Sequence, residues 1–155
     1  MSTESTNWET EKEKLILQRN RNKIQFSTTL QWLELLEDGT NLLPYFREHD
    51  CRRIAVYGAA EIGGILLKEI EKDNLMEVSY FLDKNAEKQR EKCGKPVYLP
   101  EEFAKLPEVD MVVVTAITFF ESVFDTLMCI RPEIPVVSLK KILEVRKDEV
   151  WYEQR

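Results

Sequence analysis

The sequence has few of the residues that build disulfide frameworks and metal centres. Its 155 residues include three cysteines and one histidine. Cys51, Cys93 and Cys129 form neither an even set nor a C-x-x-C pair, which argues against disulfides and zinc knuckles. A histidine-based metal site would have to combine His49 with carboxylates or thiolates scattered along the chain. We therefore predict no metal centre.

Basic charge and long apolar runs are also scarce. The 22 basic residues are outnumbered by 28 acidic ones, and no basic block is long enough to follow a phosphate backbone. The apolar stretches at 75–82 and 110–120 fall short of the roughly 18 residues that a membrane helix needs. The first residues lack the basic and apolar regions of a signal peptide. We expect a cytoplasmic protein without nucleic-acid binding or membrane insertion.

The remaining composition is that of a folded protein. Hydrophobic residues make up 43 % of the chain and charged residues 32 %, which is enough to fill a core and to solvate a surface. The length fits one folded domain with a helical appendage. We expect four segments: a flexible leader at 1–14, helices at 15–50, the folded domain at 51–147 and a tail at 148–155.

Helical spacing begins at Leu15 and produces an apolar stripe that ends near Gly39. Thr40 and Asn41 can cap a second, short helix. The stripe is formed by Phe26, Leu30, Leu33 and Leu36.

Strand and helix patterns alternate from Arg52 to about Lys147. Five strands are expected, at 53–57, 77–83, 96–99, 110–115 and 135–138. Parallel strands need crossover connections, so this alternation predicts an α/β three-layer sandwich with helices on both faces of a parallel sheet. Right-handed crossovers favour the strand order 3-2-1-4-5, with the switch point between the first and fourth strands.

A glycine turn follows the first strand and opens a helix, as in the Rossmann dinucleotide-binding fingerprint. The turn reads Gly58-Ala59-Ala60-Glu61-Ile62-Gly63, with Ala60 where the fingerprint has its second glycine. Glu61 suits the positive helix end but competes there with a phosphate. Asp83, at the end of the second strand, can accept hydrogen bonds from a ribose. The alternative is a degenerate turn that is kept for packing.

Further candidate residues lie close to this turn in the expected fold. Lys84 follows the strand-end acid, and Thr115 and Thr118 fall where the fourth strand ends, beside the switch-point crevice. Both threonines can contact the sugar of a ligand. Equally, Thr115 suits a strand, and Thr118 with Glu121 has the spacing of a capping box that opens a helix.

Four segments together resemble the small Rossmann-like domains of bacterial surface-polysaccharide biosynthesis proteins, such as the N-terminal domains of sugar acyltransferases and nucleotide-sugar 4,6-dehydratases. The resemblance spans 52–147 and leaves the N-terminal helices unmatched. It implies that the glycine turn faces a phosphate and that Asp83 faces a ribose or sugar hydroxyl. The segments are Ile54 to Gly63, Tyr80 to Lys84, Gly94 to Phe103 and Asp110 to Thr115.

These observations leave three functional hypotheses. The first is a non-catalytic accessory domain of polysaccharide biosynthesis that binds a nucleotide or nucleotide sugar and partners with an enzyme of that pathway. The second is an interaction or oligomerisation scaffold, in which the N-terminal helix with Trp32 forms a homodimer or docks to a partner. The third is a small NAD-dependent oxidoreductase. NAD and a nucleotide sugar are accordingly the two candidate ligands.

Overall fold

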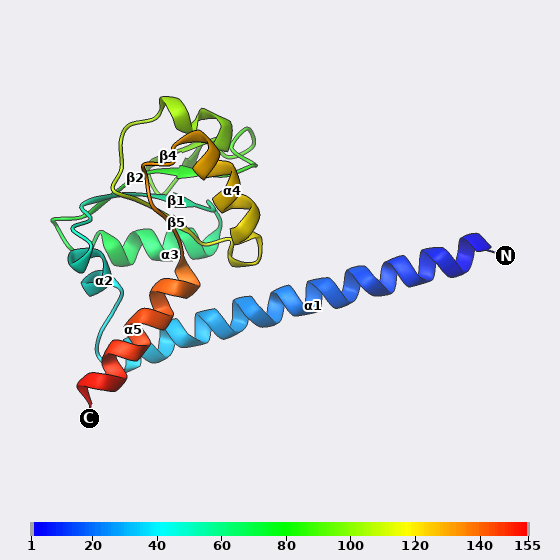
Figure 1. Cartoon of the computed structure of the whole chain (residues 1–155), viewed down its shortest axis with the longest axis horizontal. Coiled ribbons are helices and arrows are strands. Elements are labelled where there is room, and N and C mark those ends of the chain that lie inside the picture. Colours follow the sequence, from blue (N-terminus) through cyan, green and yellow to red (C-terminus); the bar gives the residue numbers. More distant parts are fainter. Residues whose placement is uncertain (1, 155) are drawn as a thin grey trace.

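A mixed six-stranded sheet forms the centre of the computed structural model, which describes residues 2–154 (Figure 1). Its five parallel strands have the predicted order β4-β2-β1-β5-β6. A two-residue strand, β3, pairs antiparallel with β4 at the edge and was not among the five expected strands. The strands are β1 (Arg53–Tyr57), β2 (Glu77–Leu82), β3 (Glu91–Lys92), β4 (Lys95–Tyr98), β5 (Met111–Val114) and β6 (Val136–Ser138).

The central strands are the most apolar ones. All four residues of β5 are buried, and β5 lies between β1 and β6. In β1 only the first residue, Arg53, is exposed. A strand that is covered on both faces needs such a continuous apolar run, because neither set of alternating side chains meets water.

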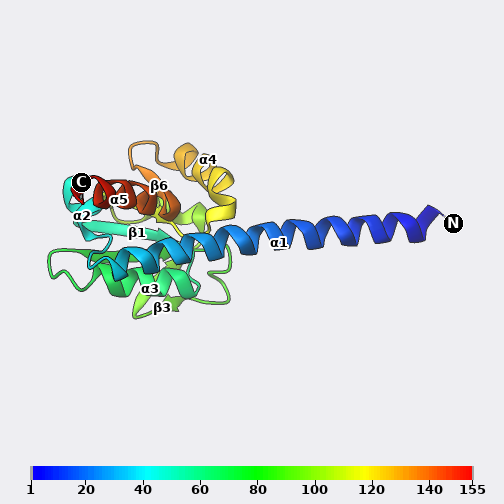
Figure 2. The same ribbon diagram turned by 90° about the horizontal axis from the view of Figure 1, so that it is seen from below.

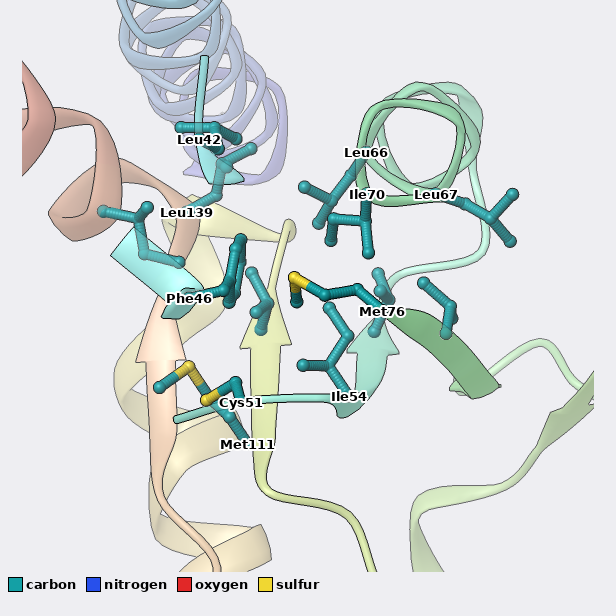
Figure 3. Packing of buried hydrophobic residues seen from close by; sticks show 14 of the residues in the cluster. Leu42, Phe46, Cys51, Ile54, Leu66, Leu67, Ile70, Met76, Met111 and Leu139 are labelled. Atoms are coloured by element: carbon teal, nitrogen blue, oxygen red, sulfur yellow. The ribbon is translucent and has the colours of Figure 1, made fainter. Parts of the chain in front are cut away.

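Helices cover both faces of the sheet. One face packs against α2 (Leu43–Glu48), α3 (Glu61–Ile70) and α5 (Leu139–Glu153), and Figure 3 shows their apolar side chains meeting above β1 and β5. The other face packs against α4 (Phe120–Ile130) and the 3₁₀ helix η1 (Pro100–Lys105). The predicted α/β three-layer sandwich is therefore confirmed.

The helix-capping predictions are partly correct. Ser138 caps α5, since its hydroxyl accepts the backbone N–H of Lys140 at 3.1 Å. Asn41 supports the start of α2 by accepting the N–H of Leu43 at 2.9 Å. The capping box at Thr118 is wrong, because that residue lies inside a 3₁₀ turn, η2 (Ile117–Phe119), and α4 begins only after it.

The N-terminal region is a single 36-residue helix, α1 (Ser2–Glu37), and its first half projects well beyond the domain (Figures 1 and 2). The expected leader continues this helix as far as the structure describes it, and Met1 lies outside the described residues. Neither glycine nor proline occurs within α1, so no residue interrupts it before Gly39, which has a φ of +82°.

The second half of α1 is fastened to the domain by buried polar contacts. The Trp32 indole donates to both carboxylate oxygens of Glu69, at 3.1 and 3.2 Å. Arg146 of α5 is 5 % exposed and donates to the Thr40 hydroxyl at 2.7 Å and to the Asn41 carbonyl at 3.0 Å. These contacts link α1, and the connection between α1 and α2, to helices that pack on the sheet.

The C-terminal tail also differs from expectation. Helix α5 continues to Glu153, through most of the expected tail at 148–155. Trp151 and Tyr152 lie on its last turns and are 48 % and 72 % exposed, with their rings in an edge contact at 5.1 Å. They are therefore not packed into the core of their own domain.

Candidate functional site

The switch point of the sheet lies between β1 and β5, as predicted, because the chain continues from β1 to β2 on one side and from β5 to β6 on the other. Ligands of open α/β sheets bind outside the carboxyl ends of the strands at such a point. Here the ends of β1, β2 and β5 bring Gly58, Asp83 and Thr115 together.

Two glycines allow α3 to begin tightly against the sheet. Gly58 has a φ of +111°, and a Cβ there would lie 2.3 Å from the Thr115 hydroxyl oxygen. A Cβ at Gly63 would lie 2.1 Å from the Gly58 carbonyl oxygen. The first and third glycines of the motif thus have the tight-turn and close-packing roles that the fingerprint assigns to them. Ala60 is exposed at the N-cap of α3.

Asp83 lies against the turn from the end of β2. One of its carboxylate oxygens accepts the Ala59 N–H at 2.8 Å, and the other accepts the Asn85 N–H at 2.8 Å. The carboxylate therefore holds the glycine turn in place and occupies the Ala59 N–H. Each carboxylate oxygen has a second lone pair, and the half-buried side chain keeps acceptor capacity toward the crevice.

Two adjoining clefts make up this crevice, and they share Gly58, Asp83 and Ala116. The turn cleft, of about 480 Å³, is lined by the Gly58–Ile62 turn, Thr115 and three residues from elsewhere in the chain. The side cleft, of about 250 Å³, includes Tyr57, Lys84, Asn85 and Phe119. Asp83 stands where the two clefts meet, so both parts of an elongated ligand would pass it.

The two predicted threonines are placed differently. Thr115 lines the turn cleft, but it is buried and its hydroxyl donates to the Tyr57 carbonyl at 3.0 Å. Thr118 is exposed and lines another cleft, with Ile24 and Lys140. The structure therefore brings Thr115, but not Thr118, together with the glycine turn and Asp83.

Sequence reasoning missed three residues of the turn cleft: Gln25, Gln89 and Lys92. Gln25 comes from α1, which passes over this end of the domain (Figure 2). Four residues earlier, the Arg21 guanidinium lies 4.7 Å from the centre of the Phe119 ring. Nothing in the local pattern of α1 indicates where that helix packs, so these contacts required the tertiary structure.

The crevice combines charges of both signs. Lys92 lies beside the first turn of α3, because a Cβ at Gly64 would be 3.0 Å from its Cε and 3.7 Å from its Nζ. Its ammonium adds to the positive helix end, while Glu61 and Asp83 oppose it. Burial, and next the negative charge of Asp83, raise the pKa of the Tyr57 phenol, which stays protonated at neutral pH.

The described residues contain neither a cluster of metal ligands nor a membrane-spanning helix. In residues 2–154, no group of three or more His, Cys, Asp and Glu side chains is placed to hold a metal ion. Among the helices described, none has both the length and the apolarity to cross a membrane.

Comparisons with known proteins indicate the fold. No family model matches the chain, and neither does any curated protein. A UDP-D-quinovosamine 4-dehydrogenase from Vibrio fischeri is similar in structure, with a TM-score of 0.50 and 16 % identity over 57 % of this chain and 77 % of that chain. At this identity the similarity concerns the fold, which is of the Rossmann type.

Two larger proteins are more distantly similar. A myo-inositol dehydrogenase from Sinorhizobium meliloti matches with a TM-score of 0.42 and 14 % identity, over 62 % of this chain and 34 % of that one. A lactate dehydrogenase from Cryptosporidium parvum matches with a TM-score of 0.39 and 19 % identity, over 63 % of this chain and 40 % of that one. The matched region is thus less than half of each of these proteins.

Proposed function

We propose that this chain binds a nucleotide or nucleotide sugar in the crevice between β1 and β5 and acts as a non-catalytic accessory domain in cell-surface polysaccharide biosynthesis. The observation that carries the proposal is the meeting of the glycine turn, Asp83 and Lys92 at the switch point. This arrangement offers a phosphate a cation and a helix N-terminus, and offers a sugar a carboxylate.

The exposed methyl group of Ala60 and the engaged N–H of Ala59 argue against a pyrophosphate packed flat on the turn. Lys92 and the first turn of α3 would instead hold the phosphates, with Asp83 toward a ribose or sugar in the side cleft. A uridine diphosphate sugar heads the candidates, since the Vibrio fischeri protein of similar fold is named for such a compound.

An accessory role is supported by the crevice side chains, because their polar groups already form hydrogen bonds within the fold. Asp83 accepts two backbone N–H groups, and the Thr115 hydroxyl donates to a carbonyl. The single histidine, His49, contacts the Tyr45 carbonyl at the end of α2 and is absent from the crevice lining. A small NAD-dependent oxidoreductase is the less favoured reading, because these groups form no acid and base pair across the crevice.

A thermal-shift screen tests the binding proposal, with NAD, NADP, coenzyme A and the diphosphate sugars of uridine, cytidine, guanosine and thymidine. A ligand at about 100 times its Kd stabilises the native state by about 2.7 kcal/mol, which raises the Tm. Lys92→Glu should abolish this shift. Lys88→Glu makes the same charge change on an exposed lysine of the same segment, outside the crevice lining, and should preserve it.

A flat screen, or equal shifts in both variants, would contradict the binding proposal. The second candidate function would then gain support: a scaffold whose site is degenerate and whose α1 helix forms a homodimer. Two observations favour it: both carboxylate oxygens of Asp83 already accept backbone N–H groups, and Gln25 of α1 lines the turn cleft. Trp32 would not be the contact residue, because it is 5 % exposed.

A further inference from the structure

Half of α1 projects beyond the domain and carries large apolar side chains (Figures 1 and 2). Trp8 and Leu15 are 71 % and 67 % exposed on this projecting half, and Phe26 is 70 % exposed where the helix reaches the domain. In proteins most of the stability of a helix comes from packing of its apolar side chains. The projecting half does not pack on its own domain, so a partner surface would stabilise it.

Five exposed apolar residues of α1 follow one face of the helix, away from the side that carries Trp32 and Arg21, whereas Leu17 and Ile24, which are 55 % and 40 % exposed, lie on another side. The positions of these five follow the alternating steps of three and four residues that place side chains along one seam of a coiled coil. Lys12, Arg19, Asn22 and Thr29 occupy the intervening seam positions. The apolar members are Trp8, Leu15, Phe26, Leu33 and Leu36.

The domain end of this seam opens into an apolar groove between α1 and α3. Leu33 and Leu36 form one wall, and Ile65, which is 55 % exposed, stands on the other. The groove measures about 210 Å³, and Lys68 and Lys72 lie along its α3 side. It therefore combines an apolar floor with a basic rim.

We propose that the occupant of this groove is the projecting half of α1 from a second copy of the chain, packed antiparallel in a two-fold symmetric dimer. The matching register places Trp8 opposite Leu33 and Leu15 opposite Phe26. In the same register Lys12 faces Thr29 and Arg19 faces Asn22. Apolar residues thus meet apolar ones, and polar residues meet polar ones, along the overlap of the two helices.

Charge complementarity supports this occupant and its direction. The first fourteen residues carry Glu4, Glu9, Glu11 and Glu13 against two lysines, so this end of α1 is acidic. In the antiparallel register Glu11 of one copy lies on the α3 side of the seam, facing the basic rim of the other copy. A parallel pair would instead place Lys12 against Lys12 and Arg19 against Arg19, in contact between like charges.

Each copy contributes one projecting half and one groove, so both are filled at once in a closed dimer. The same packing would cover the exposed Trp8 and stabilise the first half of α1. This interface is independent of the crevice ligand. The two proposals can therefore fail separately: the chain could form the dimer without binding a nucleotide, or bind a nucleotide as a monomer.

The first experiment measures mass in solution by light scattering during size-exclusion chromatography. The native chain should have twice its 18.3 kDa mass. Lys68→Glu/Lys72→Glu makes the groove acidic, and Glu4→Lys/Glu11→Lys makes the projecting helix basic. Each double variant alone should dimerise with a Kd at least about tenfold larger, because like charges then face each other.

An equimolar mixture of the two double variants provides the matched control. In the mixed dimer an acidic helix meets a basic groove at one end, and a basic helix meets an acidic groove at the other. Dimerisation should therefore recover in the mixture. The changed residues are on α1, on the exposed side of α3 or, for Lys72, in the exposed turn after it, and circular dichroism checks that each variant folds. A monomeric native chain, or no recovery in the mixture, would overturn the proposal.

Disulfide crosslinking tests the direction of packing, in a background with Cys93→Ser and Cys129→Ser. A mixture of the Trp8→Cys and Leu33→Cys chains should crosslink under mild oxidation, since these positions face each other in the antiparallel register. Trp8→Cys alone should not form a covalent dimer. A covalent dimer of that single variant would indicate parallel helices and overturn the proposed interface.

Discussion

The carboxylate of Asp83 and the backbone N–H of Ala59 form a 2.8 Å hydrogen bond across the start of the glycine turn. The residue that sequence reasoning assigned to a ribose therefore has a structural role as well. The second carboxylate oxygen has a similar bond to the Asn85 N–H. Asp83 thus joins the turn after β1 to the loop after β2, and the shape of the crevice depends on it.

Asp83→Ala should lower the free energy of unfolding by about 1.5–3 kcal/mol, because two backbone donors lose a charged acceptor. Asp83→Asn keeps one oxygen acceptor and should lose less. Urea denaturation of both variants measures the difference. If Asp83→Ala is as stable as the native chain, the turn does not depend on this carboxylate. Asp83→Asn is also the better variant for ligand binding, since it disturbs the turn least.

Gly63→Ala should destabilise the protein by about 1–3 kcal/mol, because its Cβ would lie 2.1 Å from the backbone oxygen of Gly58. Gly64→Ala is the matched control on the same helix. Its Cβ would meet the flexible end of Lys92 at 3.0 Å, and alanine favours a helix by up to about 1 kcal/mol. In thermal unfolding, the Tm of Gly64→Ala should equal or exceed that of the native chain, and the Tm of Gly63→Ala should be well below it.

Glu69 should make the protein less stable as the pH rises through the weakly acidic range. Burial raises the pKa of this carboxyl group, and the hydrogen bond from Trp32 offsets that only in part. The folded state then holds the proton more tightly than the unfolded state, so this contribution is complete below the unfolded pKa of about 4.3 and decreases as the pH rises through the folded pKa.

Glu69→Gln removes this titration. The stability of the Gln variant relative to the native chain should therefore increase between about pH 4 and pH 7, and urea unfolding at several pH values measures it. A difference that is constant with pH would show that the Glu69 carboxyl group has the same pKa in both states.

Arg146→Ala should lower the free energy of unfolding by about 3–5 kcal/mol. The side chain is buried, pairs with Glu149 and donates to Thr40 and Asn41. The adjacent Lys147→Ala removes an exposed ion pair with Glu34, whose N–O distance is 3.6 Å. It should lower the free energy of unfolding by less than about 1 kcal/mol. Chemical denaturation of the two variants compares them directly. Equal losses would mean that Arg146 does not fasten the N-terminal helices to the domain.

Local sequence patterns predicted the sheet and the turn well. The apolar run at Met111–Val114 became the buried central strand, and the order of the five parallel strands followed from crossover handedness. The two-residue β3 was missed because a pair of charged residues has no strand pattern of its own. Its single antiparallel pairing with β4 depends on the position of that edge strand.

The structure continues α1 through the segment expected to be a flexible leader, because a polar composition indicates solvation and does not exclude a helix. A polar segment without glycine or proline can continue a helix that has already begun at apolar positions, and α1 does so. The capping box at Thr118 was a wrong prediction. The chain makes a 3₁₀ turn after β5, and this moves the start of α4 to Phe120.

The sequence by itself determined the strand order, the glycine turn and the acid at the end of β2, because period and turn chemistry are local properties and the handedness of crossovers follows a general rule. Only the tertiary structure decided that Asp83 bonds to the turn, that Lys92 and Gln25 reach the same cleft, and that Thr118 does not. Those relations join residues far apart in the chain. Their distances depend on how helices pack over the sheet, which no local pattern encodes.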